Sequence, residues 1–206
     1  MKRLLVICLA CGLVAFSCAK PAEPPAEIVA AEETVQDSEW LETSPEMFTD
    51  TQRAQSELVA SATNAMFSEL MGELMAAMDA GDPSMAIGVC KNKAPEVGAK
   101  VAEQYGVQLG RTSHKLRNPA NTAPDWADEY INDLVDTPVY LVGPAGELGV
   151  MLPIKLKAEC QMCHGPQEMI DESVLAAVSE AYPEDQAVGF AEGDLRGWMW
   201  VEAPPG

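Results

Sequence analysis

The chain has 206 residues, and its 32 Asp and Glu residues against 13 Lys and Arg residues give a formal net charge of −19. This acidic balance disfavours nucleic acid and anionic lipid headgroups as direct partners, because both bind basic surfaces. Hydrophobic residues make up 48% of the chain, which suits one domain with its own core and an additional tether.

The N-terminal segment predicts export and tethering. A basic pair precedes an apolar run, so we expect residues 1–17 to be an export signal that sends the protein to the periplasm. We expect Cys18 to carry a lipid anchor as the protein's contact with the membrane; cleavage without lipidation is the alternative. Residues 18–43 are rich in Pro, Ala and Glu and are predicted to be an extended tether, of which only Trp40 and Leu41 are expected to dock onto the domain.

Residues 44–206 are predicted to form one domain that begins with a long helix. Ser44 and the following Pro-Glu resemble an N-cap with proline at the first helical position. Apolar residues at helical spacing then continue to Ala80. We interpret the Met-rich stripe of this helix as core, or as the seam of a homodimer, and not as a cofactor site.

A second helix is predicted at 84–91, and Pro95 kinks or restarts a helix that ends at Tyr105. This region carries Cys90, which remains after the other cysteines are assigned to the signal, the anchor and the motif described below. An odd cysteine in an exported protein is an inert buried thiol, half of an intermolecular disulfide, or a metal ligand. Composition favours the inert thiol.

After Gly106 the pattern changes to short strands separated by turns. The expected strands are 107–110, 139–142, 147–157 and 195–201, and the expected short helices are 124–134 and 171–181. The second and third strands are predicted to form a hairpin. Antiparallel strands with helices gathered at one end and on one face predict an α+β domain.

The motif Cys160-Gln-Met-Cys163-His164-Gly165 predicts covalent attachment of one haem c per chain. Each cysteine adds to one haem vinyl group, and the adjacent His164 is the expected proximal ligand of the iron. A redox disulfide or half of a zinc site are the alternatives, but neither requires a histidine in the next position.

Basic residues concentrate in one segment of this acidic chain, at Arg111, Lys115 and Arg117. We predict that these side chains bind the two haem propionates, because guanidinium groups pair with carboxylates through two hydrogen bonds. An exposed basic strand and loop is the alternative interpretation.

The order of these motifs resembles a family of single-haem c-type domains with a PAS-like sheet, long grouped as a domain of unknown function and found alone or fused to sensor kinases. The resemblance covers roughly residues 48–201. It is carried by Ala86-Ile-Gly-Val-Cys90, Arg111-Thr-Ser-x-Lys-x-Arg-Asn-Pro-x-Asn121, the haem motif, Tyr182-Pro-x-Asp-x-Ala-x-Gly189 and Gly193-Asp-Leu-Arg-Gly197.

This resemblance implies a PAS-like antiparallel sheet with long N-terminal helices, and an iron held by His164 and Cys90. His114 departs from the pattern, because an apolar residue is expected in its position. A His164/His114 pair therefore stays open as an alternative, as does a pair of His164 with a methionine.

Two protein ligands leave the iron without an open position, so we expect a binding module and not an enzyme. The leading hypothesis is a sensor of redox state or of a diatomic gas that acts through loss of Cys90 and signals to an unknown partner protein. The alternative is a periplasmic electron-transfer cytochrome c whose ligands never change.

Overall fold

The computed structural model describes residues 39–80 and 84–206. The expected export signal at 1–17, the expected lipid anchor Cys18 and most of the expected tether lie outside these ranges. Within the described ranges, every helix is either too short or too polar to cross a membrane.

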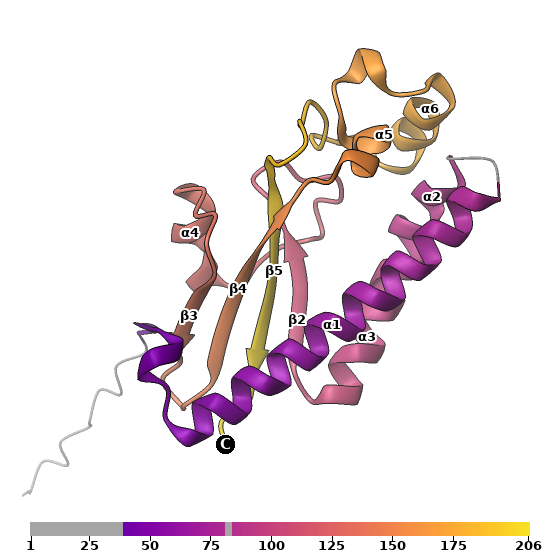
Figure 1. Cartoon of the computed structure of the whole chain (residues 1–206). Coiled ribbons are helices and arrows are strands. Elements are labelled where there is room, and N and C mark those ends of the chain that lie inside the picture. The colour runs from indigo at the N-terminus through magenta and orange to yellow at the C-terminus, as the bar shows by residue number, and fades with distance from the viewer. Residues whose placement is uncertain (1–38, 81–83) are drawn as a thin grey trace, which may run out of the picture. The chain divides into compact units, whose positions relative to one another are not determined.

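The domain is built on a five-stranded antiparallel sheet with the order β1-β3-β4-β5-β2 (Figure 1). The strands are β1 (Leu41–Thr43), β2 (Gln108–Thr112), β3 (Val139–Val142), β4 (Leu148–Lys155) and β5 (Leu195–Ala203). With the long helices beside this sheet, the predicted α+β class is confirmed. The predicted hairpin is present as β3 and β4.

The sheet takes in the end of the segment that we expected to be tether, because β1 pairs with β3. Trp40 anchors the chain at this point, with its ring 5.3 Å from the ring of Trp126. Trp126 is partly buried against this cluster, and its indole N–H donates to Glu202 at 2.6 Å. Packing of the two aromatic rings offsets the entropy lost in ordering a three-residue edge strand.

Different elements bury the two faces of the sheet. Met199 and Val201 of β5 pack against helices α1 (Asp50–Asp79) and α3 (Ala94–Tyr105). Trp198, the residue before Met199 in β5, lies on the opposite face beside the short elements η3 (Asp125–Ala127) and α4 (Asp128–Asn132). Successive side chains of a strand point to opposite faces, so this alternation follows from the sequence of β5.

Helix α1 begins later than its sequence suggested. Ser44 precedes only a short 3₁₀ turn, η1 (Pro45–Met47), and the α-helix starts at Asp50. Thr49 and Gln52 form a capping box: each side chain accepts from the other's backbone N–H, at 3.2 and 2.8 Å. This box gives hydrogen-bond partners to the backbone N–H groups of Thr49 and Gln52, so Thr49 and not Ser44 is the N-cap of the helix.

The helix after α1 is irregular just before Pro95. The short α2 (Met85–Gly88) continues through a π-helical turn, η2 (Val89–Lys93), into α3. Proline has no N–H to give to the preceding turn, and a wider π-helical turn accommodates that loss. Cys90 therefore lies on an irregular turn. The predicted end of the helix at Tyr105 is confirmed.

Short elements connect β4 to β5 and form the far end of the domain (Figure 1). They are η4 (Ala158–Cys160), α5 (Gln161–His164), η5 (Gln167–Met169) and α6 (Glu172–Ala181). Asp171 caps α6 by accepting from the Ser173 backbone N–H at 2.8 Å. The predicted helix at 171–181 is confirmed, and the haem motif lies on η4 and α5.

We expect Gly106→Ala to lower the free energy of unfolding by about 1 kcal/mol, because Gly106 ends α3 in the left-handed region with φ 64°. Gly72→Ala is the matched control: Gly72 lies inside α1 and has no atom within 4 Å of an added Cβ, so alanine should raise stability by about 0.5–1 kcal/mol. Denaturant unfolding of both variants measures the difference. Equal effects would contradict the left-handed cap.

Candidate functional site

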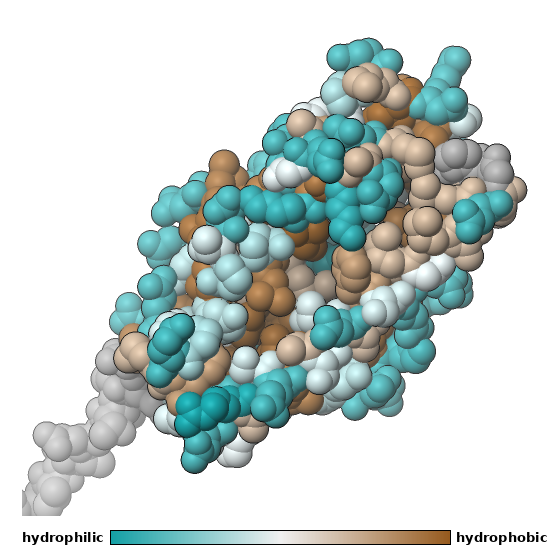
Figure 2. Space-filling model, viewed as in Figure 1, coloured by the Kyte–Doolittle hydropathy of each residue, from teal (hydrophilic) through white to brown (hydrophobic). Residues whose placement is uncertain are grey.

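A cavity of about 250 Å³ lies between the second half of α1, the turn η2, one end of the sheet and α5. Figure 2 shows apolar side chains gathered in the hollow between α1 and the sheet. On the α1 side the wall consists of Met66, Phe67, Leu70, Met71, Leu74, Met75 and Met78. The remaining wall carries thiols, an imidazole and cationic side chains.

The Met-rich stripe of α1 thus changes its environment along the helix. Met66 is buried in the main core with Val97 and Val101, as predicted. Met66 also reaches the cavity, and from Phe67 onward the stripe lines it, because α1 continues past the strands that cover its first half (Figure 1). The expectation of core packing is therefore corrected for the second half of the stripe; the homodimer alternative stays a prediction.

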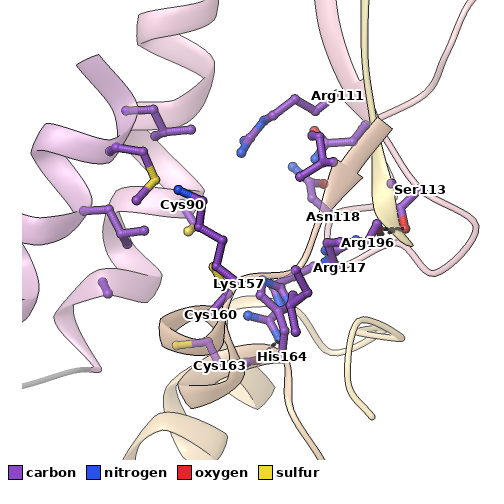
Figure 3. Close-up of a pocket in the computed structure, with 18 of the residues that line it drawn as sticks. Cys90, Arg111, Ser113, Arg117, Asn118, Lys157, Cys160, Cys163, His164 and Arg196 are labelled. Atoms are coloured by element: carbon purple, nitrogen blue, oxygen red, sulfur yellow. Dashed lines mark hydrogen bonds between the residues drawn. The ribbon is translucent and has the colours of Figure 1, made fainter. Parts of the chain in front are cut away.

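Cys160, Cys163 and His164 come from one short turn and all line the cavity (Figure 3). The 3₁₀ turn η4 ends at Cys160, and α5 covers the next four residues. Both thiols are free. Burial raises the pKa of the Cys163 thiol, so this side chain is protonated at neutral pH.

A hydrogen bond orients the His164 ring. Its Nδ1 lies 2.7 Å from the carbonyl oxygen of Ala187. A carbonyl only accepts, so Nδ1 carries the proton and Nε2 keeps its lone pair. Burial also lowers the pKa of His164 well below its ordinary value, which leaves the ring neutral. A neutral imidazole with a free Nε2 is the form that binds a metal.

Cys90 reaches the same cavity from the helical side (Figure 3). Composition favoured an inert buried thiol, whereas the structure leaves Cys90 half-buried in the cavity wall on η2. The fold therefore brings a thiol and the His164 imidazole to one space from distant parts of the sequence. In the described part of the chain, no three His, Cys, Asp or Glu side chains gather as a ready metal site.

Two arginines at the cavity have donor groups without a partner in the described part of the chain. The Arg111 side chain makes no hydrogen bond or ion pair there, and burial lowers its pKa. Arg196 donates from Nη1 to the Ser113 hydroxyl at 2.9 Å, but its buried Nε has no partner. Burial lowers the pKa of Arg196 to about 10. Buried cations without a counter-charge are costly, so this wall suits an anionic ligand group.

Arg117 has a different role from the predicted propionate contact. Its Nε and Nη2 each lie 3.1 Å from a carboxylate oxygen of Asp185, and the pair is buried. Nη2 also donates to the carbonyl oxygen of Cys163 at 2.6 Å. The guanidinium therefore braces the haem-motif turn, and its carboxylate partner comes from the protein.

Lys115 and His114 do not line the cavity. The Lys115 Nζ lies 4.9 Å from the centroid of the Phe190 ring, and the His114 ring packs edge-on against Phe190 and Trp198. Both line a separate pocket with Asp136 and Asp194. The structure thus places neither side chain in the cavity wall, because the chain leaves β2 before it reaches them and turns away. The geometry gives no support to the propionate contact of Lys115 or to His114 as the alternative iron ligand, and both stay predictions.

Sequence reasoning missed Arg196 and Lys157, which both line the cavity. Arg196 belongs to a motif that carried the family resemblance, but no role was assigned to it. A cation at the start of a strand whose next residues, Gly197 to Val201, carry no charge was the available signal. Lys157 directly precedes η4, and its Nζ lies 5.5 Å from the centroid of the Phe67 ring.

Comparison with known proteins agrees with this fold. The crystal structure of the cyanobacterial heme-protein Tll0287 matches with a TM-score of 0.55 and 22% sequence identity, covering 79% of this chain and 97% of that one. Comparison with curated proteins gave no match. The sequence model of the Tll0287-like family matches residues 32–204, which includes the sheet, both long helices and the whole cavity. The chain therefore belongs to the Tll0287-like family.

Proposed function

We propose that this chain binds one haem c covalently in the cavity and acts as an exported module that senses redox state or a diatomic gas. The observation that carries the proposal is the convergence on one cavity of Cys160, Cys163, His164, Cys90 and two unpaired arginines. The similar solved structure is of a protein named as a heme-protein, which supports the choice of ligand.

Cys160 and Cys163 would hold the haem through thioether bonds. Each thiol adds across one vinyl double bond: the sulfur bonds to one vinyl carbon, and the thiol hydrogen goes to the other. The addition balances without an oxidant or a leaving group. The free state of both thiols and the protonated form of Cys163 fit this reaction.

His164 would bind the iron through Nε2, and Cys90 would bind it through its sulfur. A bound haem supplies an iron that takes up and releases one electron. A thiolate ligand donates electron density and favours the ferric state. The methionines and leucines of α1 would cover the macrocycle and exclude water from it.

Arg111 and Arg196 fit the two haem propionates. Both guanidinium groups line the cavity; in residues 39–80 and 84–206 the Arg111 side chain makes no hydrogen bond, and the buried Nε of Arg196 has no partner. A carboxylate satisfies such donors through charge-assisted hydrogen bonds. This assignment replaces Lys115 and Arg117 of the original prediction and keeps Arg111.

We assign the exchangeable role to Cys90 because the two ligands are held differently. A hydrogen bond to Ala187 fixes the His164 ring, whereas Cys90 lies on the π-helical turn η2, next to α1. Release of the Cys90 sulfur would let this turn relax, and the helices would transmit the change to a partner protein. We therefore propose a binding module and not an enzyme.

The purified protein is expected to carry haem that stays with the chain after denaturation, and to show a low-spin thiolate signal in its ferric state. Reduction with dithionite should remove the thiolate signal and allow rapid CO binding, because a thiolate is protonated more easily when it faces ferrous iron. Absorption and EPR spectra with and without CO measure this. A six-coordinate spectrum that persists after reduction, with no CO binding, would favour electron transfer with fixed ligands.

Cys90→Ala should abolish the ferric low-spin thiolate signal while the haem stays covalently attached, because attachment depends on Cys160 and Cys163. His114→Ala is the matched control and should leave the spectrum unchanged, since His114 lies outside the cavity. EPR of both ferric variants distinguishes the two. A wild-type signal in Cys90→Ala, or its loss in His114→Ala, would refute the assignment of the sixth ligand.

Replacing Arg111 or Arg196 with Gln should lower the haem midpoint potential, because removing a nearby cation stabilises the more positive ferric state. A shift of about tenfold in the ferric–ferrous equilibrium corresponds to 59 mV. Arg53→Gln, in an exposed ion pair on α1, removes the same charge far from the cavity and should leave the potential unchanged. Redox titration that gave equal values for all variants would count against propionate pairing.

A further inference from the structure

The carbonyl group that orients His164 is itself held by a buried ion pair. The Ala187 carbonyl oxygen accepts from His164 Nδ1 at 2.7 Å and from Arg117 Nη2 at 3.4 Å. The Ala187 backbone N–H donates to Asp185 Oδ1 at 2.9 Å. Both polar groups of this residue's backbone are therefore bonded to the Arg117–Asp185 pair.

The same pair joins the haem-motif turn to the segment at 185–190. Arg117 Nη2 donates to the Cys163 carbonyl oxygen at 2.6 Å. Beside it, the Phe190 N–H donates to the His164 carbonyl oxygen at 3.0 Å, and the Gly189 N–H donates to Gly165 at 2.8 Å. Arg117 thus contacts both segments that meet at His164.

A purely stabilising role does not account for this arrangement. The Arg117 and Asp185 side chains are only 7% and 9% exposed, and a buried ion pair often contributes no more stability than apolar side chains of similar size. What the pair adds is direction: a planar guanidinium with several donors in a rigid geometry fixes the acceptors that it contacts. One of these acceptors is the partner of His164.

We propose that Arg117 and Asp185 are positioning residues for His164. They hold the Ala187 carbonyl against Nδ1–H, and this hydrogen bond sets the ring orientation and raises the basicity of Nε2. The inference rests on the proposed role of His164 as iron ligand. On this proposal the Arg117–Asp185 pair controls the redox equilibrium of the iron through His164, although neither side chain is a ligand.

The first test is Arg117→Lys, which keeps the charge but loses the planar set of donors. We expect the ferric–ferrous equilibrium to move about tenfold toward the ferrous form, equivalent to a midpoint potential 59 mV higher, and the ferric EPR signal to broaden. Lys100→Arg is the control, because it makes the reverse exchange in the exposed Lys100–Glu69 pair, which lies outside the cavity wall. It should change neither readout.

A double variant, Arg117→Met with Asp185→Leu, covers the case in which a single replacement does not fold. It fills the buried space with apolar side chains and leaves no unpaired charge. We expect the same rise in midpoint potential even if the double variant and the wild type have equal midpoint temperatures of unfolding. An unchanged potential and EPR signal in a folded double variant would overturn the proposal.

Amide and imidazole proton exchange keeps this test separate from the haem proposal. If the purified full chain carries no covalent haem, the proposed function fails, and NMR of the His164 Nδ1 proton then reports on positioning alone. We expect slow exchange in the wild type and Lys100→Arg and at least tenfold faster exchange in the double variant. Equal exchange rates in all three would also overturn the positioning role.

Discussion

The pairing of β5 with both β4 and β2 is the constraint on which the cavity depends. Trp198 of β5 pairs with Thr112 on one side and with Pro153 on the other. This register brings the end of β2, the start of β5 and the end of β4 together at one end of the sheet. Arg111, Arg196 and the turn that begins at Cys160 are therefore neighbours, and α1 closes the space between them with apolar side chains.

The arginines at this end of the sheet differ in whether their side-chain donors have hydrogen-bond partners. Arg117 donates from Nε and Nη2 to Asp185 and to backbone carbonyl groups, so its role is to hold the surrounding segments in place. Arg111 and Arg196 keep donors that the described part of the chain does not satisfy. In a chain with a net charge of −19, retaining two such cations in a cavity is best explained by an anionic ligand group.

The groups proposed to bind iron also differ in how the fold holds them. His164 is fixed through Ala187 to a buried ion pair, whereas Cys90 lies on a π-helical turn between two helices. Irregular helical turns occur often at functional sites because they store an alternative hydrogen-bonding pattern. This contrast between a rigid and a deformable attachment is what a ligand-exchange sensor requires.

The sequence by itself determined what depends on neighbouring residues: the Cys160–His164 motif, the hairpin of β3 and β4, the interruption at Pro95 and the α+β class. It did not predict the long-range partners. Arg111, Lys115 and Arg117 were indistinguishable as basic residues in one segment, yet in the structure Arg117 pairs with Asp185, Lys115 lies outside the cavity wall, and Arg111 lines the cavity without a side-chain hydrogen bond. Asp185 comes from a distant loop to pair with Arg117, and β2 ends before Lys115. Likewise, half of the Met-rich stripe lines the cavity because α1 extends past the end of the sheet, which only the tertiary structure shows. Local hydrogen bonding and periodicity are encoded in adjacent residues, but which charges find partners is decided by the register of strands far apart in the chain.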